Sequence, residues 1–441
     1  MCFPFVRHLI AATVIWMLAL PAQAVTFLRD SEIEFALSEL ARPILNAAGL
    51  PGHTKIIVIQ DRSLNAFVVD TRAIYLHSGL ILELESAAQL QSVIAHEAAH
   101  IANGHLTRRL ANQRSASTLT TLGFALAAVA AASGNGDAAG GIALGTTGSA
   151  QRNYLAHTRS EESAADQSSF RYLRAAGVDT SAAVEVLNIF RGQEALSVSR
   201  QDPYARSHPL TRDRIRAFEG LVAGNPSPVA ESDTADYWFA RAQGKLSAFT
   251  QNPGWTLRRT RGATDTISLM RQAVAHHRVP NTERAMAAIN ALVAARPNDP
   301  FVHELKGQIL LESRQAAGAV AAYARAIELA PSDALILASY GRALLALDTA
   351  DGNRRALSVL EQSRARDDRN ANMLRDLGLA YARNGQNGQA SLAVAERYAL
   401  RGRFSDAAIH AQRAVDQLPR GSASWQRAQD VLRTAEQISG R

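Results

Sequence analysis

The pattern of apolar and polar positions divides the chain into a mixed first half and a helical second half. A run of β-branched apolar residues at 55–60 predicts a β-strand, and shorter apolar runs at 66–69 and 73–76 predict two more. From residue 236 to residue 441 the chain is helical throughout by the same criteria. We therefore expect an α+β fold, mostly α, with a small β-sheet in its first half.

Two capping boxes predict the main helices of the mixed region. One begins at Ser86 and predicts a long helix through about Ala111, and the other begins at Thr158 and predicts a second helix. Gly177 is placed to end the second helix. Between the two helices, the apolar part of residues 118–148 is shorter than the roughly 20 residues of a membrane span. We expect a helical excursion with a Gly-rich tip there rather than a membrane hairpin.

The helical second half contains a repeat of 34 residues. Pro297 and Pro331 are 34 residues apart. Gly307 and Gly341 have the same separation, and the residues between them have the offsets of a tetratricopeptide repeat. We expect an all-α tetratricopeptide-repeat solenoid, with a generic helical bundle as the alternative. The expected organisation is a signal peptide at 1–24, a mixed domain at 25–225, a Pro- and Ser-containing linker at 226–235 and the repeat domain at 236–441.

The N-terminus and the composition bear on where the protein works. Arg7, the apolar run at 9–20 and the small residues that follow predict a signal peptide cleaved after Ala24, with an uncleaved membrane anchor as the alternative. Cys2 lies within this segment and is the only cysteine, so the mature chain would contain no disulfide, which a chain of this size does not need. The net charge of +7 is spread along the chain without a dense Lys/Arg run, and no nucleic-acid partner is expected.

His96, Glu97 and His100 form an HExxH motif inside the first predicted helix. Residues four apart lie on one face of a helix, so His96 and His100 can bind the same ion, and imidazole is a good ligand for zinc. Glu97 is close enough to take a proton from a water that zinc activates. The apolar flanks of the helix favour this interpretation over two core histidines with a surface glutamate. The motif predicts a metallopeptidase site with one Zn²⁺ per chain and Glu97 as the general base.

A catalytic zinc ion needs a third protein ligand. Glu162, in the first turn of the second predicted helix, is the best candidate, and Asp166 follows on the same face, where it could accept a hydrogen bond from a ligand imidazole. Glu161 is the rival ligand, although it more naturally closes the capping box. The alternative is an acidic first turn that matches the helix dipole. His105 follows His100 by five residues and falls off the ligand face, so we expect it to be solvated.

The HExxH motif with Glu162 and Asp166 resembles the gluzincin metallopeptidases, and more narrowly the periplasmic beta-barrel assembly-enhancing proteases. That group combines a signal peptide, a zincin-type peptidase domain and a C-terminal tetratricopeptide array, and the resemblance covers nearly the whole mature chain. It implies that Asn65, Ala66 and Phe67 belong to an edge strand that binds extended substrate, through main-chain pairing that demands no particular sequence. The alternative for this stretch is a structural hairpin.

The resemblance also extends to a segment with an extra histidine near the metal. It implies that His208 occupies the open zinc position in a resting state, or else stabilises the oxyanion during turnover with the help of Arg214. A histidine on the zinc would displace the catalytic water and keep the enzyme latent, whereas the alternative is a surface His-Pro turn. Members of the group can carry a disulfide in the repeat domain, which this chain cannot form, so the rigidity of that domain stays open.

Together the motifs and the resemblance predict a periplasmic zinc endopeptidase. It would degrade misfolded or stalled polypeptides, outer-membrane beta-barrel precursors above all, and assist outer-membrane protein assembly. Its expected partners are these unfolded substrates and the barrel-assembly machinery, bound through the repeat domain, and peripheral association with a membrane stays open. A second hypothesis is a chaperone-like repeat scaffold at the barrel-assembly machinery with a mostly latent zinc site.

Overall fold

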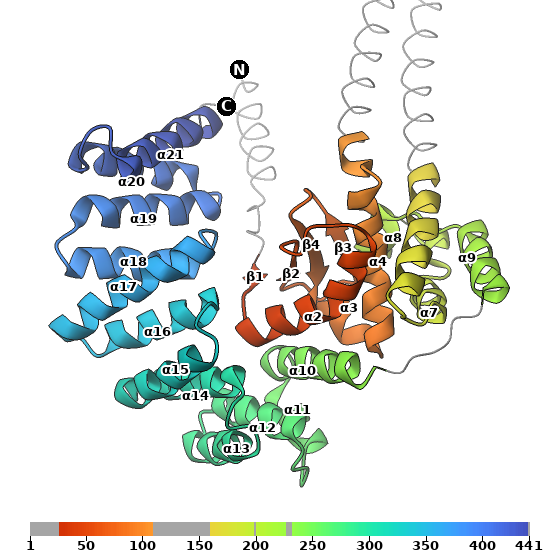
Figure 1. Ribbon diagram of the computed structural model, residues 1–441, viewed down its shortest axis with the longest axis horizontal. Helices are drawn as coiled ribbons and strands as arrows, with labels where there is room; N and C mark the ends of the chain where they lie inside the picture. Colours follow the sequence, from red (N-terminus) through yellow and green to blue (C-terminus); the bar gives the residue numbers. More distant parts are fainter. Residues whose placement is uncertain (1–25, 109–158, 198–199, 226–231, 440–441) are drawn as a thin grey trace, which may run out of the picture. The chain divides into compact units, whose positions relative to one another are not determined.

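The computed structural model of the chain describes residues 26–108, 159–197, 200–225 and 232–439. These residues are mostly helical, with one four-stranded sheet (Figure 1). None of their helices is both long and apolar enough to cross a membrane. The expected signal peptide, the segment 118–148 and most of the expected linker lie outside the described residues.

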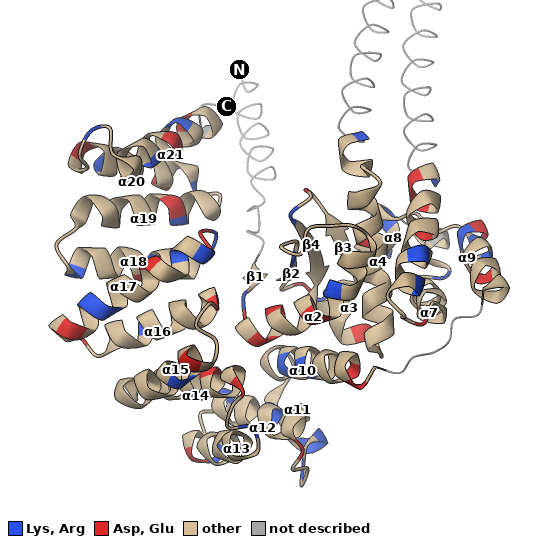
Figure 2. Cartoon of the chain, in the orientation of Figure 1, with Lys and Arg blue, Asp and Glu red and all other residues tan. Residues whose placement is uncertain are grey.

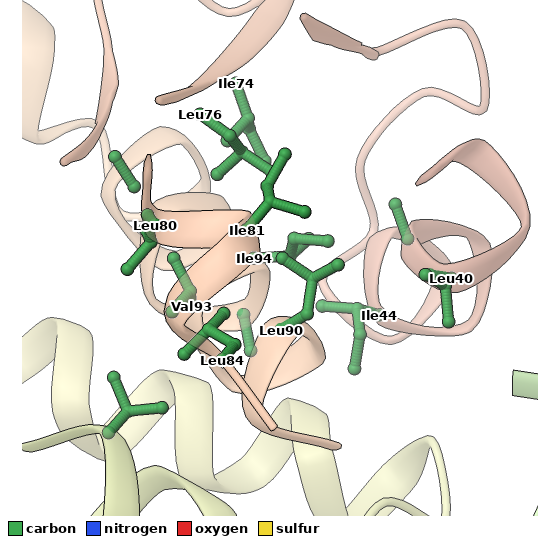
Figure 3. Packing of buried hydrophobic residues seen from close by; sticks show 14 of the residues in the cluster. Leu40, Ile44, Ile74, Leu76, Leu80, Ile81, Leu84, Leu90, Val93 and Ile94 are labelled. Carbon is green, nitrogen blue, oxygen red and sulfur yellow. The ribbon is translucent and has the colours of Figure 1, made fainter. Parts of the chain in front are cut away.

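The first half is built around a small sheet covered by helices. β2 and β4 run parallel, with Ile56 opposite Ile74, while β1 and β3 pair antiparallel at the two edges. Figure 3 shows Ile74 and Leu76 of β4 packed among the leucines and isoleucines of the neighbouring helices. The three predicted strands are confirmed, and β1, only two residues long, was not predicted. The elements are β1 (Phe27–Leu28), α2 (Ser31–Ala47), β2 (Lys55–Ile59), β3 (Ala66–Val68), β4 (Ala73–His77), α3 (Ser78–Glu83), α4 (Ala87–Ala102), an unlabelled helix over 159–175, α7 (Ser181–Ile189), α8 (Pro203–Ser207) and α9 (Arg212–Gly224).

The helix of the HExxH motif, α4, is buried along nearly its whole length. It starts as predicted, because the hydroxyl of Ser86 accepts a hydrogen bond of 3.2 Å from the backbone N–H three residues on. It ends at Ala102 rather than near Ala111, because Gly104 adopts a φ of +68°, through which an α-helix cannot continue. The second predicted helix ends as expected, with Gly177 at a φ of +71°.

The second half is a series of helical hairpins, as predicted for tetratricopeptide repeats. Gly307 of α14 lies so close to the ring of Tyr323 in α15 that a Cβ would clash with it. Gly341 of α16 meets Leu360 of α17 in the same way, so the 34-residue spacing of the glycines reflects equivalent contacts. The helices are α10 (Asp233–Thr250), α11 (Pro253–Arg259), α12 (Thr266–Arg278), α13 (Thr282–Ala295), α14 (Pro300–Glu312), α15 (Ala316–Leu329), α16 (Ala334–Ala346), α17 (Ala350–Arg366), α18 (Ala371–Arg383), α19 (Asn387–Leu400), α20 (Phe404–Gln417) and α21 (Ala423–Ser439).

A buried ionic cluster joins α2 to the helices of the second half. Lys245 of α10 is fully buried, and its ammonium nitrogen lies 2.9 Å, 3.2 Å and 3.4 Å from carboxylate oxygens of Asp30, Glu32 and Glu304, respectively. Arg241, one turn earlier on α10, pairs with Glu32 and with a carboxylate at the start of α14. Figure 2 shows the basic residues of α10 next to acidic residues of α2. These contacts hold the mixed region and the first repeats together in one compact unit, residues 27–368, while residues 369–441 belong to a second unit.

Candidate metal centre

Four buried side chains from separate parts of the first half converge on one point. His96 and His100 lie one turn apart on α4. Glu162 comes from the helix over 159–175, and His208 is the C-cap residue of α8. One ligand atom from each of the four lies within 4.8 Å of all the others. The structure therefore brings the three predicted ligands and the extra histidine together.

The separations measured from Nε2 of His96 are close to those in a tetrahedral metal site. Nε2 of His96 lies 3.1 Å from Nε2 of His100. The same atom lies 3.2 Å from Oε2 of Glu162 and 3.3 Å from Nδ1 of His208. Ligands about 2.0–2.1 Å from a tetrahedral zinc ion stand about 3.4 Å apart, so this set of donors fits such an ion. Glu161, the rival ligand, is buried but is not part of the group.

Glu97 lies beside the four ligands and is completely buried. Its Oε1 is 3.3 Å from Nε2 of His208, on the side of that ring opposite the ligand atom. The ring of Tyr204 packs against the ring of His208 with 4.6 Å between centroids and a tilt of 35° between the ring planes. Burial, and next the charge of Glu97, raise the pKa of Tyr204 well above its ordinary value, so its hydroxyl stays protonated. Tyr204 was not predicted from the sequence, although it precedes His208 by one helical turn.

Asp166 connects the ligand His96 to Arg214. Its Oδ1 lies 3.2 Å from Nδ1 of His96, and both of its oxygens accept hydrogen bonds of 2.8 Å from Arg214. Burial by itself raises the pKa of Asp166, but the hydrogen bonds with Arg214 and His96 outweigh it, and the pKa is lowered. An ionised Asp166 keeps the proton of His96 on Nδ1 and leaves Nε2 free for the metal. Arg214 also lies 3.2 Å from Oε2 of Glu162, and its role at an oxyanion stays a prediction.

The expectation that His105 is solvated was wrong. His105 is only 1% exposed, and its Nδ1 lies 3.0 Å from Nδ1 of His100. The expectation assumed one continuous helix, whereas the break at Gly104 changes the direction of the chain just before His105. The Asn-Gly pair that follows the motif was the available signal, because such pairs commonly end helices.

The predicted substrate strand, β3, is an edge of the sheet among the described strands. The carbonyl of Asn65 accepts a hydrogen bond from β4, so by strand alternation the backbone groups of Ala66 and Val68 point away from β4. The ring of Phe67 stacks on Tyr75 of β4 with 5.4 Å between centroids. Since α4 and α8 both contact β3, the strand lies next to the elements that carry the metal ligands.

The fold and the site together define a metallopeptidase domain of the HExxH type. Residues 28–222 of the chain match the model of Peptidase family M48. The match contains all four residues of the ligand group as well as Glu97.

Curated relatives share this domain. The beta-barrel assembly-enhancing protease of Escherichia coli (strain K12) is 27% identical over 198 residues, which are 45% of this chain and 40% of the relative. The protein of the same name from Yersinia pestis is 25% identical over 287 residues, 64% of this chain and 58% of the relative. The chain thus spans 38% to 58% of the lengths of the curated relatives it matches.

Solved structures of repeat proteins have a weaker likeness to the chain. MamA is 17% identical with a TM-score of 0.30, covering 38% of this chain and 94% of that one. YrrB, a tetratricopeptide-repeat protein, is 15% identical with a TM-score of 0.32, covering 45% of this chain and 98% of that one.

Proposed function

We propose that the protein is a zinc-dependent endopeptidase of the periplasm, exported by cleavage after Ala24. It cleaves misfolded or stalled polypeptides, in particular precursors of outer-membrane beta-barrels, and thereby assists outer-membrane protein assembly. The observation that carries the proposal is the buried group of His96, His100, Glu162 and His208 with Glu97 beside it. The names of the relatives support the role in barrel assembly.

The chemistry follows from the residues around the site. A bound zinc ion would polarise the scissile carbonyl and lower the pKa of the attacking water. Glu97 takes the proton of that water and delivers it to the leaving amine. Because Glu97 is fully buried, bulk water does not screen the charge of its carboxylate. The surrounding protein holds the carboxylate in place for both proton transfers.

Substrate enters as an added strand on β3. Val68 is partly exposed and directs its backbone donor and acceptor away from β4, where an extended polypeptide can pair with them, whereas Ala66 is fully buried and becomes available only when the residues that cover it move. Main-chain pairing reads no side chains and requires an unfolded segment. This selectivity suits an enzyme that removes proteins which have failed to fold, and it supports the assignment of substrate class.

A second candidate function is a chaperone-like repeat scaffold with a mostly latent site. The position of His208 favours it, because Nδ1 of this residue belongs to the ligand group and Nε2 faces Glu97. With His208 there, neither the metal nor the base is open to substrate. The two functions are compatible if the segment that carries His208 moves away when a substrate binds.

The test is the Glu97→Gln variant with an unfolded test protein as substrate. We expect it to retain one zinc ion per chain and to lose cleavage, because an amide cannot take up the proton. Glu85→Gln, an exposed change immediately before α4, is the control and should keep full activity. Cleavage at the wild-type rate by Glu97→Gln would falsify the mechanism. Restoration of barrel assembly in cells by this variant would favour the scaffold function.

A further inference from the structure

The C-terminal unit carries most of the net positive charge of the protein. Residues 369–441 contain eleven arginines, no lysine and six carboxylates, a net charge of +5 out of +7 for the chain. Four of these arginines belong to α18, α19 and the start of α20: the guanidinium groups of Arg397 and Arg403 share the ring of Tyr398, and Arg401 follows Arg397 by one helical turn. Besides burial, the charges of Arg401, Arg375 and Arg403 all act to lower the pKa of Arg397. This Arg397 cluster is Arg375, Arg397, Arg401 and Arg403.

Arg397 occupies a position that two preceding repeats fill with a small residue. In three successive repeats, a glycine of the first helix contacts a side chain of the second helix. The residue three positions after that side chain occupies the same place in each repeat. That residue is Ala326 in the first repeat and Ser363 in the second, and both are fully buried. In the third repeat it is Arg397, whose Nε atom is enclosed without a hydrogen-bond partner among the described residues. The glycine contacts are Gly307 with Tyr323, Gly341 with Leu360 and Gly378 with Val394.

The cluster lacks its own counter-charges at two positions. Arg375 pairs with Asp376, and Arg403 pairs with Asp406. Arg397 and Arg401 have no carboxylate within 4.0 Å in the described part of the chain. Burial, and next the repulsion from Arg401, lower the pKa of Arg397. An anion beside these two guanidinium groups would relieve the repulsion between them.

An aromatic side chain holds the cluster in place. The guanidinium carbons of Arg403 and Arg397 lie 4.7 Å and 5.6 Å from the centre of the Tyr398 ring. The ring of Tyr398 is also stacked on His410 of α20, with 5.4 Å between centroids. Guanidinium groups stacked on a ring keep their N–H donors free for an acceptor in the plane of the group. The donors are therefore arranged before any ligand arrives.

We propose that the Arg397 cluster is a docking site for an acidic polypeptide segment, with carboxylates bound by Arg397 and Arg401. A peptide fits better than a flat anionic surface, because Arg397 is only partly exposed and stands at a position that is buried in the two preceding repeats, so an acceptor has to project on a side chain to reach it. Leu400, which is 43% exposed next to Arg401, offers an apolar contact for residues between the acidic ones. The proposal does not depend on the peptidase activity.

The experiment measures binding to the full mature chain in the Glu97→Gln background, so that the probe is not cleaved. The probe is a fluorescein-labelled ten-residue peptide of alternating Glu and Ala, with a Gln-Ala peptide of the same length for comparison. We expect Arg397→Gln/Arg401→Gln to weaken binding of the acidic peptide by about tenfold or more, the usual loss when charge-assisted hydrogen bonds are removed. Arg420→Gln/Arg433→Gln removes the same charge elsewhere in the unit and should change the Kd by less than about twofold.

Equal losses in the two double variants, or equal binding of the acidic and the Gln-Ala peptides, would overturn the proposal in favour of diffuse attraction. Loss of binding to phosphatidylglycerol vesicles by Arg397→Gln/Arg401→Gln, with peptide binding unchanged, would assign the cluster to a membrane surface instead. Arg397→Lys covers the case in which the double variant does not fold. It keeps the charge but lacks the forked donors of the guanidinium group, so it should bind the peptide more weakly than the parent chain, and unchanged binding would contradict recognition by that group.

Discussion

Arg214 binds Asp166 through two parallel hydrogen bonds of 2.8 Å, one to each carboxylate oxygen. Asp166 in turn lies 3.2 Å from Nδ1 of the metal ligand His96. The ligand is therefore oriented by a residue of α9, which follows it by more than a hundred positions in the chain. All three side chains are buried, so solvent does not weaken the contacts.

Replacing Arg214 by Lys should weaken metal binding, because an ammonium group cannot form the two parallel bonds that fix Asp166. We expect zinc affinity to fall by about 10–100-fold, the usual effect of losing such a supporting contact. Competition with a chromogenic chelator measures it. Arg216→Lys, on the exposed side of α9, is the control and should bind zinc normally. Normal affinity with reduced turnover in Arg214→Lys would instead support the predicted role of Arg214 at the oxyanion.

His105 should support the second ligand in the same way. When Nε2 of His100 binds the metal, Nδ1 of His100 carries the proton. This N–H donates a hydrogen bond to Nδ1 of His105, 3.0 Å away. His105→Ala removes this acceptor, and we expect roughly tenfold weaker zinc binding. His53→Ala, at an exposed position, is the control. If both variants bind zinc equally well, the contact has no part in metal binding.

His208→Ala tests whether the site is latent. The remaining ligands, His96, His100 and Glu162, are sufficient for a catalytic zinc ion with one open position. We expect zinc to be retained and cleavage of an unfolded protein to rise by roughly tenfold, the gain for a closed state favoured by about 1.4 kcal/mol. A fall in cleavage with zinc retained would show that His208 acts in turnover. Unchanged cleavage and zinc content would leave the residue without either role.

Local rules account for the part of the site that the sequence predicted. His96 and His100 share a helix face because they are four residues apart, and a helix predicted from its capping box presents both. Glu162 could be predicted as a ligand from the sequence. A carboxylate in the first turn of a helix either interacts with the helix dipole or acts as a metal ligand, and the HExxH motif favoured the second.

Non-local packing accounts for what was missed. The contact of His105 depends on the backbone direction after Gly104, and β1 is too short to carry a pattern. The pairing of Lys245 with Glu304 joins residues 59 positions apart on different helices, and no periodicity in either helix marks it. Such pairs arise from the way α10 and α14 meet α2, which the local sequence does not encode.

Glu304 should make the stability of the first compact unit depend on pH. Burial, opposed by the attraction of Lys245, raises the pKa of Glu304 to about 7 from its ordinary value of 4.5, with the charges of Asp30 and Glu32 adding to the effect. Between these two pH values the folded state binds a proton that the unfolded state has lost. The contribution of Glu304 to stability is therefore complete below pH 4.5 and decreases as the pH rises through 7.

The substitution Glu304→Gln should remove this dependence, because the amide is neutral at every pH and still accepts a hydrogen bond from Lys245. We expect the variant to be more stable than the parent by on the order of 1–3 kcal/mol at pH 8, and close to it at pH 5. Urea unfolding followed by circular dichroism at the two pH values measures the difference. The variant leaves the other charged residues of the buried cluster unchanged, which are Asp30, Glu32, Arg241 and Asp299. Glu328→Gln, whose side chain is 64% exposed, is the control and should shift neither midpoint. A destabilised Glu304→Gln at pH 8 would mean that an ionised Glu304 is needed to hold Lys245, and that burial does not dominate its pKa.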